Sequence, residues 1–376
     1  MNAALLLARR NLATNRIRLL ASLGGIALAF SLTLALDGIY AGVAKQLTIY
    51  IDRSGADIWI AQAGVRNLHM VASWLPATVT AQVRDVEGVA DAVPILYSTD
   101  TITAGSERAV AYVIGLPSGA PIGGPWQIVE GSARPGTGEI VVDRGFARRA
   151  KVVLGDSVTV LGRAARIVGL SEGTATLLNS VAFVPFDDFR ATRGDAPVVS
   201  FVLARVEPGA SAAGVAAEIE RRVPGVTGQS SAAFSEAERR LVMDMSADVI
   251  AVMSSIGFLV ALMVVALTVY VATYARRAEY GTLKALGAPN RFLYRLVIAQ
   301  AVLGVAAGFV AAAAITSFLG AVIGVADLDL ELIVTAGSLG KVSLSGLIIA
   351  GLAAVLPTRQ MATLDPAVVF RKGAAL

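Results

Sequence analysis

The residues with the most distinctive types and spacing form the segment RRAEYGTLKALGAP at 276–289, between two long runs of apolar residues. Glu279 lies near the start of a helix-prone stretch and Lys284 near its end, an order of charges that suits the helix dipole. Gly281 and Ala285 are four residues apart and leave a strip without large side chains. This pattern predicts the binding of another protein's surface.

The end of the same segment carries helix-boundary signals. Gly287 is suited to end the helix, and Pro289 to start the next one in its first turn, where a missing N–H costs nothing. From the residues alone, a docking helix and a well-capped turn that only carries positive charge explain the segment equally well.

Residues that could support catalysis are scarce. The chain has no cysteine and a single histidine, His69, which excludes a thiolate site and a histidine cluster for a metal. It contains neither G-x-x-x-x-G-K-[ST] for nucleotide phosphates nor a G-x-S-x-G turn, and we interpret the glycine-rich 115–124 as a turn. We therefore predict no catalytic residue, no metal site and no cofactor in this chain, and we interpret His69 as a surface or packing residue.

The composition indicates a membrane protein. Hydrophobic residues make up 55% of the 376 residues and charged residues 16%, with a mean hydropathy of +0.68. This is too apolar for an ordinary soluble protein, and the basic residues do not form a nucleic-acid-binding face. The apolar segments that predict membrane helices are Leu19–Leu36, Val249–Tyr274, Leu296–Val325 and the weaker Val342–Leu356.

Basic residues near the ends of these segments predict the orientation. They precede the first segment, join the second to the third and follow the fourth, whereas the third-to-fourth connection is acidic. The basic residues are Arg9, Arg10, Arg16, Arg18, Arg276, Arg277, Lys284, Arg291, Arg295, Arg359, Arg371 and Lys372, and the acidic ones Asp327, Asp329 and Glu331. We expect a multi-pass protein of the cytoplasmic (inner) membrane with both termini in the cytoplasm.

The first apolar segment is longer than the core of a typical signal peptide, so we expect it to be retained. Residues 1–18 mix apolar residues with arginines and predict an amphipathic helix at the inner interface. The expected division of the chain after this helix is 19–51, first membrane helix and stalk; 52–234, external domain; 235–274, stalk and second membrane helix; 275–295, cytoplasmic helix; 296–325, third membrane helix; 326–341, external loop; 342–358, fourth membrane helix; 359–376, cytoplasmic tail.

Residues 52–234 predict a mixed α+β domain, because short β-prone runs bounded by Gly, Pro or Asp alternate with amphipathic stretches. The predicted strands are Ala56–Ala61, Ala109–Leu116, Ile140–Asp143, Ser157–Leu161, Ala164–Leu170, Val181–Pro185 and Val198–Val206. The predicted helices are Thr80–Val86, Arg144–Ala150 and Ser211–Val223.

The two helices that flank this domain are expected to continue out of the membrane and to pack on one another as a stalk. Ser235 and Glu238 fit a capping box that would start the second helix. Ordinary juxtamembrane helices that merely hold the domain are the alternative. The stripes that predict the stalk are Ile39, Val43, Leu47 and Tyr50 on the first helix, and Leu241, Met245, Val249, Val252 and Ile256 on the second.

Residues 276–289 and the tail LPTRQMATLDPAVVFRKG (356–373) resemble the MacB/FtsX-like permease family of ABC transporters, and the order of one helix, a large external domain and three helices is similar to that family. Further pieces that carry the resemblance are GADIWI (55–60) and VLGDSVTV (153–160), and, closest to DevC-like exporter permeases, RIRLLASLGGIALAF (16–30) and NLHMVASWLP (67–76).

The resemblance implies that 276–289 is a coupling helix inserted into a separate ABC ATPase, which would bind ATP and magnesium. It also implies a second permease subunit, in a homodimer or heterodimer, and allows a periplasmic adaptor. The residues assigned to coupling are Arg277, Glu279, Tyr280, Gly281, Lys284, Ala285, Gly287 and Pro289.

Two pairs of small residues predict close helix packing, Gly304 with Gly308 and Gly320 with Gly324. The pairs face different directions, so one is expected to meet a helix of the same chain and the other a second subunit. A packing role within one chain explains both equally well.

We predict a permease subunit of an ABC exporter that works by mechanotransmission. An FtsX-like signalling subunit that regulates a cell-wall hydrolase is the alternative, and no residues support a membrane-anchored enzyme. The candidates for substrate or lipid contact are Leu68, Met70, Trp74 and Leu75, with burial in the domain core as the competing interpretation.

Overall fold

The computed structural model describes residues 16–174, 180–325 and 331–362, and the chain divides into two compact units. The membrane unit comprises Met1–Gly42 and Ser246–Leu376, and the external unit comprises Val43–Met245. The expected interface helix and most of the cytoplasmic tail lie outside the described residues.

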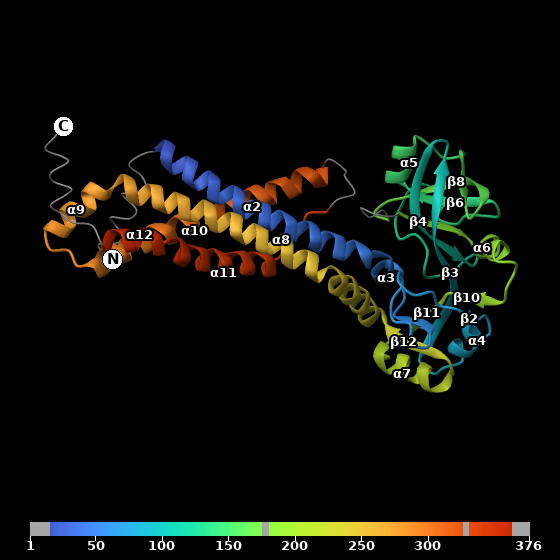
Figure 1. Cartoon of the computed structure of the whole chain (residues 1–376). Helices are drawn as coiled ribbons and strands as arrows, with labels where there is room; N and C mark the ends of the chain where they lie inside the picture. Colours follow the sequence, from blue (N-terminus) through green and yellow to red (C-terminus); the bar gives the residue numbers. More distant parts are fainter. Residues whose placement is uncertain (1–15, 175–179, 326–330, 363–376) are drawn as a thin grey trace. The chain divides into compact units, whose positions relative to one another are not determined.

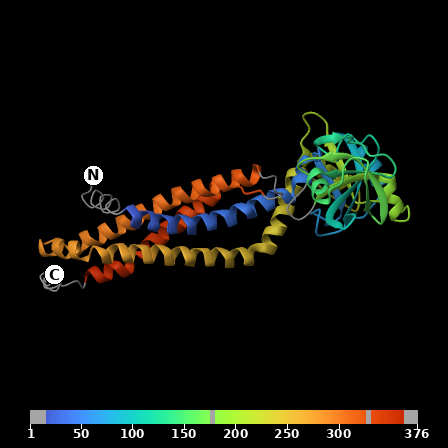
Figure 2. The same cartoon turned by 90° about the horizontal axis from the view of Figure 1, so that it is seen from above.

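Four helices are long and apolar enough to cross a membrane, as the sequence predicts. The candidate spans are Leu23–Leu47, Ala251–Ala275, Asn290–Gly324 and Ala336–Arg359. The helices of the membrane unit lie side by side in both views (Figures 1 and 2). Their bounds are α2 Arg16–Leu47, α8 Ser231–Ala275, α9 Arg277–Ala285, α10 Asn290–Val325, α11 Ala336–Ala353 and α12 Val355–Ala362.

A common core joins the four long helices. Ile26 and Phe30 of α2 pack with Val265 of α8, Val305 of α10 and Ile349 of α11, and all five side chains are at most 4% exposed. Burial of this many branched and aromatic side chains supplies most of the packing between helices that otherwise face lipid.

Small residues set the distance between α2 and α10. A Cβ atom added to Gly308 would lie 2.4 Å from Cγ2 of Ile26, and one added to Gly304 would lie 3.9 Å from the same side chain. Gly304 and Gly308 therefore pack against a helix of their own chain, which is one of the two roles expected for a small-residue pair. Gly320 instead approaches the backbone of Leu332, and Gly324 has no described atom in reach.

Two membrane helices begin earlier than the sequence predicts. The third begins at Asn290, not Leu296, and its 36 residues would measure about 54 Å. The fourth begins at Ala336, not Val342, because the side chain of Thr335 accepts a hydrogen bond from the Ser338 N–H as an N-cap. The expected external loop 326–341 is correspondingly shorter.

The prediction that the two helices flanking the external domain pack on one another as a stalk is wrong. On α8, Met245, Val249, Val252 and Ile256 are 56–63% exposed and do not pack on α2. In this part of α2 the close contact is made at a small residue instead. A Cβ atom added to Gly42 would overlap the carbonyl oxygen of Glu331. The chain also breaks at Thr48, before α3 (Ile49–Arg53), so the first helix is not one stiff unit through Tyr50.

The predicted capping box is also wrong. α8 begins at Ser231, four residues before Ser235. Ser235 donates to Asp52 at 2.5 Å instead, and Glu238 accepts from the loop around residue 68. Both side chains thus serve tertiary contacts of the external unit and not the helix start.

The external unit contains a 10-stranded sheet in the order β12-β1-β11-β3-β4-β9-β6-β8-β5, with β7 paired to both β3 and β8. The pairings of β3, β4, β9, β6, β8 and β7 close a ring of strands. The bounds are β1 Ile58–Gln62, β2 Leu75–Pro76, α4 Val79–Arg84, β3 Val89–Ala104, β4 Glu107–Leu116, β5 Ile128–Gly131, β6 Glu139–Asp143, α5 Arg144–Ala150, β7 Ser157–Val160, β8 Arg163–Ser171, β9 Ser180–Pro185, α6 Phe186–Thr192, β10 Val198–Val199, β11 Phe201–Val206, α7 Ala212–Arg222 and β12 Val226–Ser230.

All seven predicted strands and three predicted helices of this unit occur, but its longest strand is missing from the prediction. The strand β3 pairs with β11 through Ile95 and with β4 from Leu96 onward, so it belongs to both parts of the sheet. Pro94 lies within it, opposite Val202, and a proline inside a run argues against a strand. Ser200 splits the predicted strand Val198–Val206 into β10 and β11.

Candidate functional site

The helix α9 ends in a Schellman motif. Gly287 has φ +90°, and its N–H donates to the carbonyl of Lys284 at 3.1 Å. The N–H of Ala288 donates to the carbonyl of Leu283 at 3.0 Å. These two bonds satisfy carbonyls that the helix end leaves free, and they require a residue that tolerates a positive φ. The predicted stop at Gly287 is confirmed, and α10 begins directly after Pro289.

Tyr280 fixes α9 against the first turns of α10. Its ring is 1% exposed and packs with Leu293 and Leu296, and its hydroxyl donates to Oε1 of Gln300 at 3.2 Å. Burial raises the pKa of the Tyr280 hydroxyl, so it stays a hydrogen-bond donor at neutral pH. The two helices therefore form one packed hairpin.

The other face of α9 is open. The guanidinium of Arg277 lies 4.6 Å from the centroid of the Tyr274 ring and donates to its hydroxyl at 2.8 Å. Glu279 forms an ion pair with Arg276 at 3.4 Å and its side chain is 59% exposed. Leu286, at the C-terminal end of the helix, is 80% exposed.

The residues assigned to coupling divide between these two faces. Gly281 is buried, so the bare strip expected from Gly281 and Ala285 is present only at Ala285. Leu286 was not among the assigned residues, although a leucine just before a helix-ending glycine was a usable signal. The exposed assigned residues are Arg277, Glu279, Ala285, Gly287 and Pro289; Lys284 is half-buried, and Tyr280 and Gly281 are buried.

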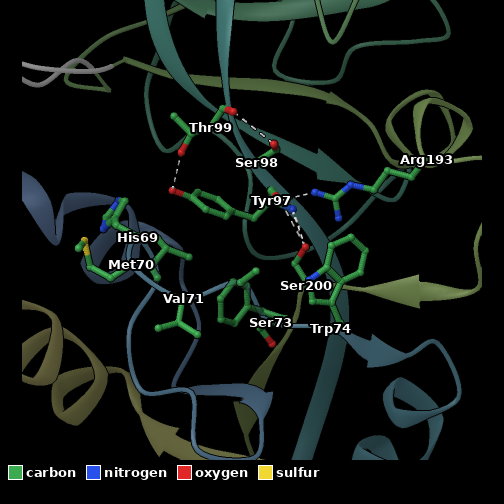
Figure 3. Close-up of a pocket in the computed structure, with 13 residues that line it drawn as sticks. His69, Met70, Val71, Ser73, Trp74, Tyr97, Ser98, Thr99, Arg193 and Ser200 are labelled. Atoms are coloured by element: carbon green, nitrogen blue, oxygen red, sulfur yellow. Dashed lines mark hydrogen bonds between the residues drawn. The ribbon is translucent and has the colours of Figure 1, made fainter.

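A second candidate site lies in the external unit. It is a cavity of about 190 Å³ between the loop that follows β1 and the middle of β3 (Figure 3). Arg193, which follows α6, and the residues at the start of β11 complete its wall. The lining residues are Leu68, His69, Met70, Val71, Ala72, Ser73, Trp74, Tyr97, Ser98, Thr99, Arg193, Ser200 and Phe201.

Three of the four residues predicted for substrate or lipid contact line this cavity. Met70 and Trp74 are 50% and 48% exposed, whereas Leu68 is 2% exposed and belongs mainly to the core. Leu75 is 1% exposed, pairs with Val199 between β2 and β10, and does not line the cavity. For Leu75 the competing interpretation, burial in the core, is the correct one.

Glu238 of α8 holds the cavity loop. One carboxylate oxygen accepts from the Leu68 N–H at 2.6 Å, and the other lies within hydrogen-bond distance of Nδ1 of His69, at 2.7 Å. Glu238 is fully buried. The His69 ring packs against the Tyr112 ring, with the two ring centroids 4.3 Å apart. His69 is thus a packing residue, as the sequence analysis allowed.

Arg193 is the cation of the cavity. Its guanidinium lies over the rings of Trp74 and Phe189, 4.7 and 4.9 Å from their centroids. It donates one hydrogen bond, to the carbonyl of Tyr97 at 2.9 Å, and burial lowers its pKa. Among the described residues no carboxylate pairs with it.

Comparisons with known proteins agree on the family. The profile of the MacB-like periplasmic core domain matches residues 19–222, and that of the FtsX-like permease C-terminal region matches residues 251–366. An ABC transporter permease of Mycobacterium tuberculosis (strain H37Rv) is 24% identical over 371 residues, covering 96% of this chain and 98% of the relative. A second permease of that strain is 23% identical over 372 residues with the same coverage.

Two solved structures are similar at lower identity. The periplasmic region of MacB from Actinobacillus actinomycetemcomitans has a TM-score of 0.38 and 12% identity, covering 50% of this chain and 94% of that one. The extracellular domain of the noncanonic ABC-type transporter YknZ from Gram-positive bacteria has a TM-score of 0.36 and 15% identity, covering 46% and 99%. Because one family profile spans more than half of the residues and a second spans most of the remainder, the chain belongs to the MacB/FtsX-like family of ABC transporter permeases.

Proposed function

We propose that the chain is the permease subunit of an ABC exporter in which a separate ATPase grips α9 and α8 carries the resulting movement to the external domain. The observation that carries this proposal is the continuity of α8, a single helix of 45 residues from Ser231 to Ala275. A continuous helix transmits displacement along its length, whereas a flexible linker would absorb it.

The first turns of α8 belong to the core of the external unit. The ring of Phe234 stacks on Trp59 with centroids 5.1 Å apart and planes 9° apart. Ser235 donates to Asp52, and Glu238 accepts from the loop at Leu68. A shift of this end of α8 would therefore displace buried aromatic and charged contacts together.

The last turn of α8 leads directly into α9. Only Arg276 separates the two helices, and its N–H donates to the carbonyl of Thr273 at 3.1 Å. Because Tyr280 ties α9 to α10, a force on the exposed face of α9 would act on a packed hairpin and not on a loose loop. This supports a role for α9 in receiving force from the ATPase.

A second permease subunit is part of the proposal. The span of α8 is 22% buried within this chain, against 35–44% for the other three spans. It therefore offers the largest apolar face for a second permease or for lipid. We place the protein in the cytoplasmic membrane with both termini inside, which puts the basic α9 segment beside an ATPase. The assignment to the DevC-like branch and the adaptor stay predictions.

Export is favoured over signalling by the cavity beside Arg193. A subunit that only regulated a hydrolase would need a docking surface for a protein, whereas this unit has a half-open cavity lined by exposed apolar side chains and a cation. Such a volume suits a small amphiphilic substrate.

The docking role of α9 is tested by Leu286→Asp, co-expressed with the cognate ATPase. We expect ATPase association to weaken about 30-fold or more, since loss of an anchoring apolar side chain at an interface costs about 2 kcal/mol or more. Co-purification and permease-stimulated ATP hydrolysis are the measurements. Val153→Asp is the matched control, because Val153 is a similarly exposed apolar residue (64%) of the external unit. Equal association of both variants with the ATPase would refute the docking role.

A further inference from the structure

We propose that the cavity between the loop at 68–74 and Arg193 binds an acyl-chain amphiphile with one anionic head group. This inference deepens the proposed function, on which it rests only in treating the bound molecule as the exported substrate.

Arg193 carries a positive charge that no carboxylate of a described residue pairs with. A guanidinium has five N–H donors, and here one of them is used, by the carbonyl of Tyr97. The guanidinium also lies over the rings of Trp74 and Phe189, and its remaining N–H groups form no hydrogen bond with a described residue. A carboxylate or phosphate accepts from two such groups at once, which makes it the matching ligand.

Polar side chains line the same cavity as the Arg193 guanidinium. Ser98 and Ser200 lie on the same wall, and in Figure 3 the side chain of Arg193 reaches toward Tyr97 between them. The Ser98 hydroxyl donates to the carbonyl of Thr99 at 3.3 Å and the Ser200 hydroxyl to that of Tyr97 at 3.5 Å, and either hydroxyl would have to turn from this long bond to donate to a head group. No described carboxylate lines the cavity; that of Glu238 lies behind the loop, where the Leu68 N–H and the His69 ring contact it.

The loop at the rim of the cavity exposes apolar side chains. Met70, Val71 and Trp74 are 50%, 48% and 48% exposed on the loop that closes the cavity. Single exposed apolar residues are ordinary, but three on one short loop form an amphiphilic surface beside a cation that has no carboxylate partner among the described residues. An apolar tail attached to the anion would cover these side chains.

The size of the cavity limits what it holds. A volume of about 190 Å³ is below the range of about 300–1,000 Å³ typical of pockets that enclose a whole drug-sized ligand. The cavity fits a head group and a few methylene groups, so the rest of the ligand's acyl chain must lie along the rim. A ligand with a large rigid body does not fit this description.

The test uses the full chain in phosphatidylcholine nanodiscs without ATPase, and 8-bromooctanoate as the probe. Bromine quenches tryptophan at short range, so we expect saturable quenching that Trp74→Phe removes. Arg193→Gln should weaken binding about tenfold or more, the effect of losing a charged hydrogen bond, while Arg193→Lys should retain most of it. The control is Arg190→Gln, because Arg190 already pairs with Asp187 and Asp195 on the same segment.

Several results would overturn the proposal. These are equally tight binding of the neutral 8-bromooctan-1-ol, equally tight binding of inorganic phosphate in competition, unchanged binding by Arg193→Gln, or saturable quenching that persists in Trp74→Phe. An unchanged thermal midpoint of Arg193→Gln separates lost binding from lost folding. Because no ATPase is present, failure here leaves the coupling role of α9 untouched, and failure of the Leu286→Asp test leaves this site untouched.

Discussion

At the scale of single residues, Glu238 has the most demanding position in the external unit. A fully buried carboxylate is costly unless hydrogen bonds satisfy both oxygens, and here Leu68 and His69 do so. The same residue lies on α8 and holds the loop that lines the cavity. A contact that stabilises the fold thus also joins the candidate substrate site to the helix proposed to move.

The first prediction concerns this carboxylate. Glu238→Ala leaves the Leu68 N–H and the His69 ring without their acceptor, so we expect a loss of about 1–3 kcal/mol in the free energy of unfolding. Faster hydrogen exchange of the 66–74 amides should accompany it. Glu236→Gln is the control, since Glu236 is on the same turn but exposed, with its pKa lowered by Arg240 and Arg239. Similar exchange of the loop in both variants would contradict the anchoring role.

How far the sequence predicts single residues depends on the range of their contacts. The helix stop at Gly287 is local, so the residue type alone predicts it. The burial of Tyr280 depends on Gln300, 20 residues further on, and that of Leu75 on its pairing with Val199. Neither partner is visible in a local pattern, and Leu75 was accordingly misassigned.

At the scale of elements, the packing of α2 against α10 depends on Gly308, because a glycine has no side chain to hold the two helices apart. The Ile26 atoms nearest to Gly308 are Cβ and Cγ2, which cannot move far without moving α2 itself. Periodicity and small-residue spacing predict that such a contact exists, but they do not name its partner. The same limit explains why the apolar stripe of α8 was expected to meet α2 and instead lies exposed.

The second prediction tests this contact. We expect Gly308→Ala to lower the stability of the membrane unit by about 1–3 kcal/mol, because the added methyl overlaps Ile26. Gly304→Ala should change little, since its added Cβ stays 3.9 Å from the same side chain. Unfolding in a denaturing detergent gives the measurement. The double variant Gly308→Ala with Ile26→Ala should recover part of the loss; if it is no more stable than Gly308→Ala, the overlap with Ile26 is not the cause.

At the scale of the whole molecule, both candidate sites are served by one helix. At its start, α8 contributes the buried side chains of Phe234 and Glu238 to the external unit. At its other end, α8 leads into α9. The sequence predicts the spans and the external α+β domain, because hydropathy and strand periodicity are local. It does not predict β3, because Pro94 interrupts the local signal while pairing with β11 preserves the strand.

The third prediction separates docking from transmission. Val249→Pro removes a backbone hydrogen bond in the exposed middle of α8 and costs about 3 kcal/mol of helix stability. We expect the ATPase still to co-purify, because α9 is unchanged, while a nucleotide-dependent change in hydrogen exchange of the 66–74 amides disappears. Val249→Ala keeps the helix and serves as the control. A nucleotide response in Val249→Pro equal to that of Val249→Ala would rule out transmission through α8.

The strand β3 has a further consequence for folding. It forms ladders with β11 over its first half and with β4 over its second, so one stretch of backbone belongs to three hydrophobic cores. A slip of β3 by one residue would turn its side chains to the opposite face in all three cores at once. Neither half can therefore melt and leave the other intact. The external unit should lose its structure in a single all-or-none transition, which makes it one cooperative folding unit despite its three cores.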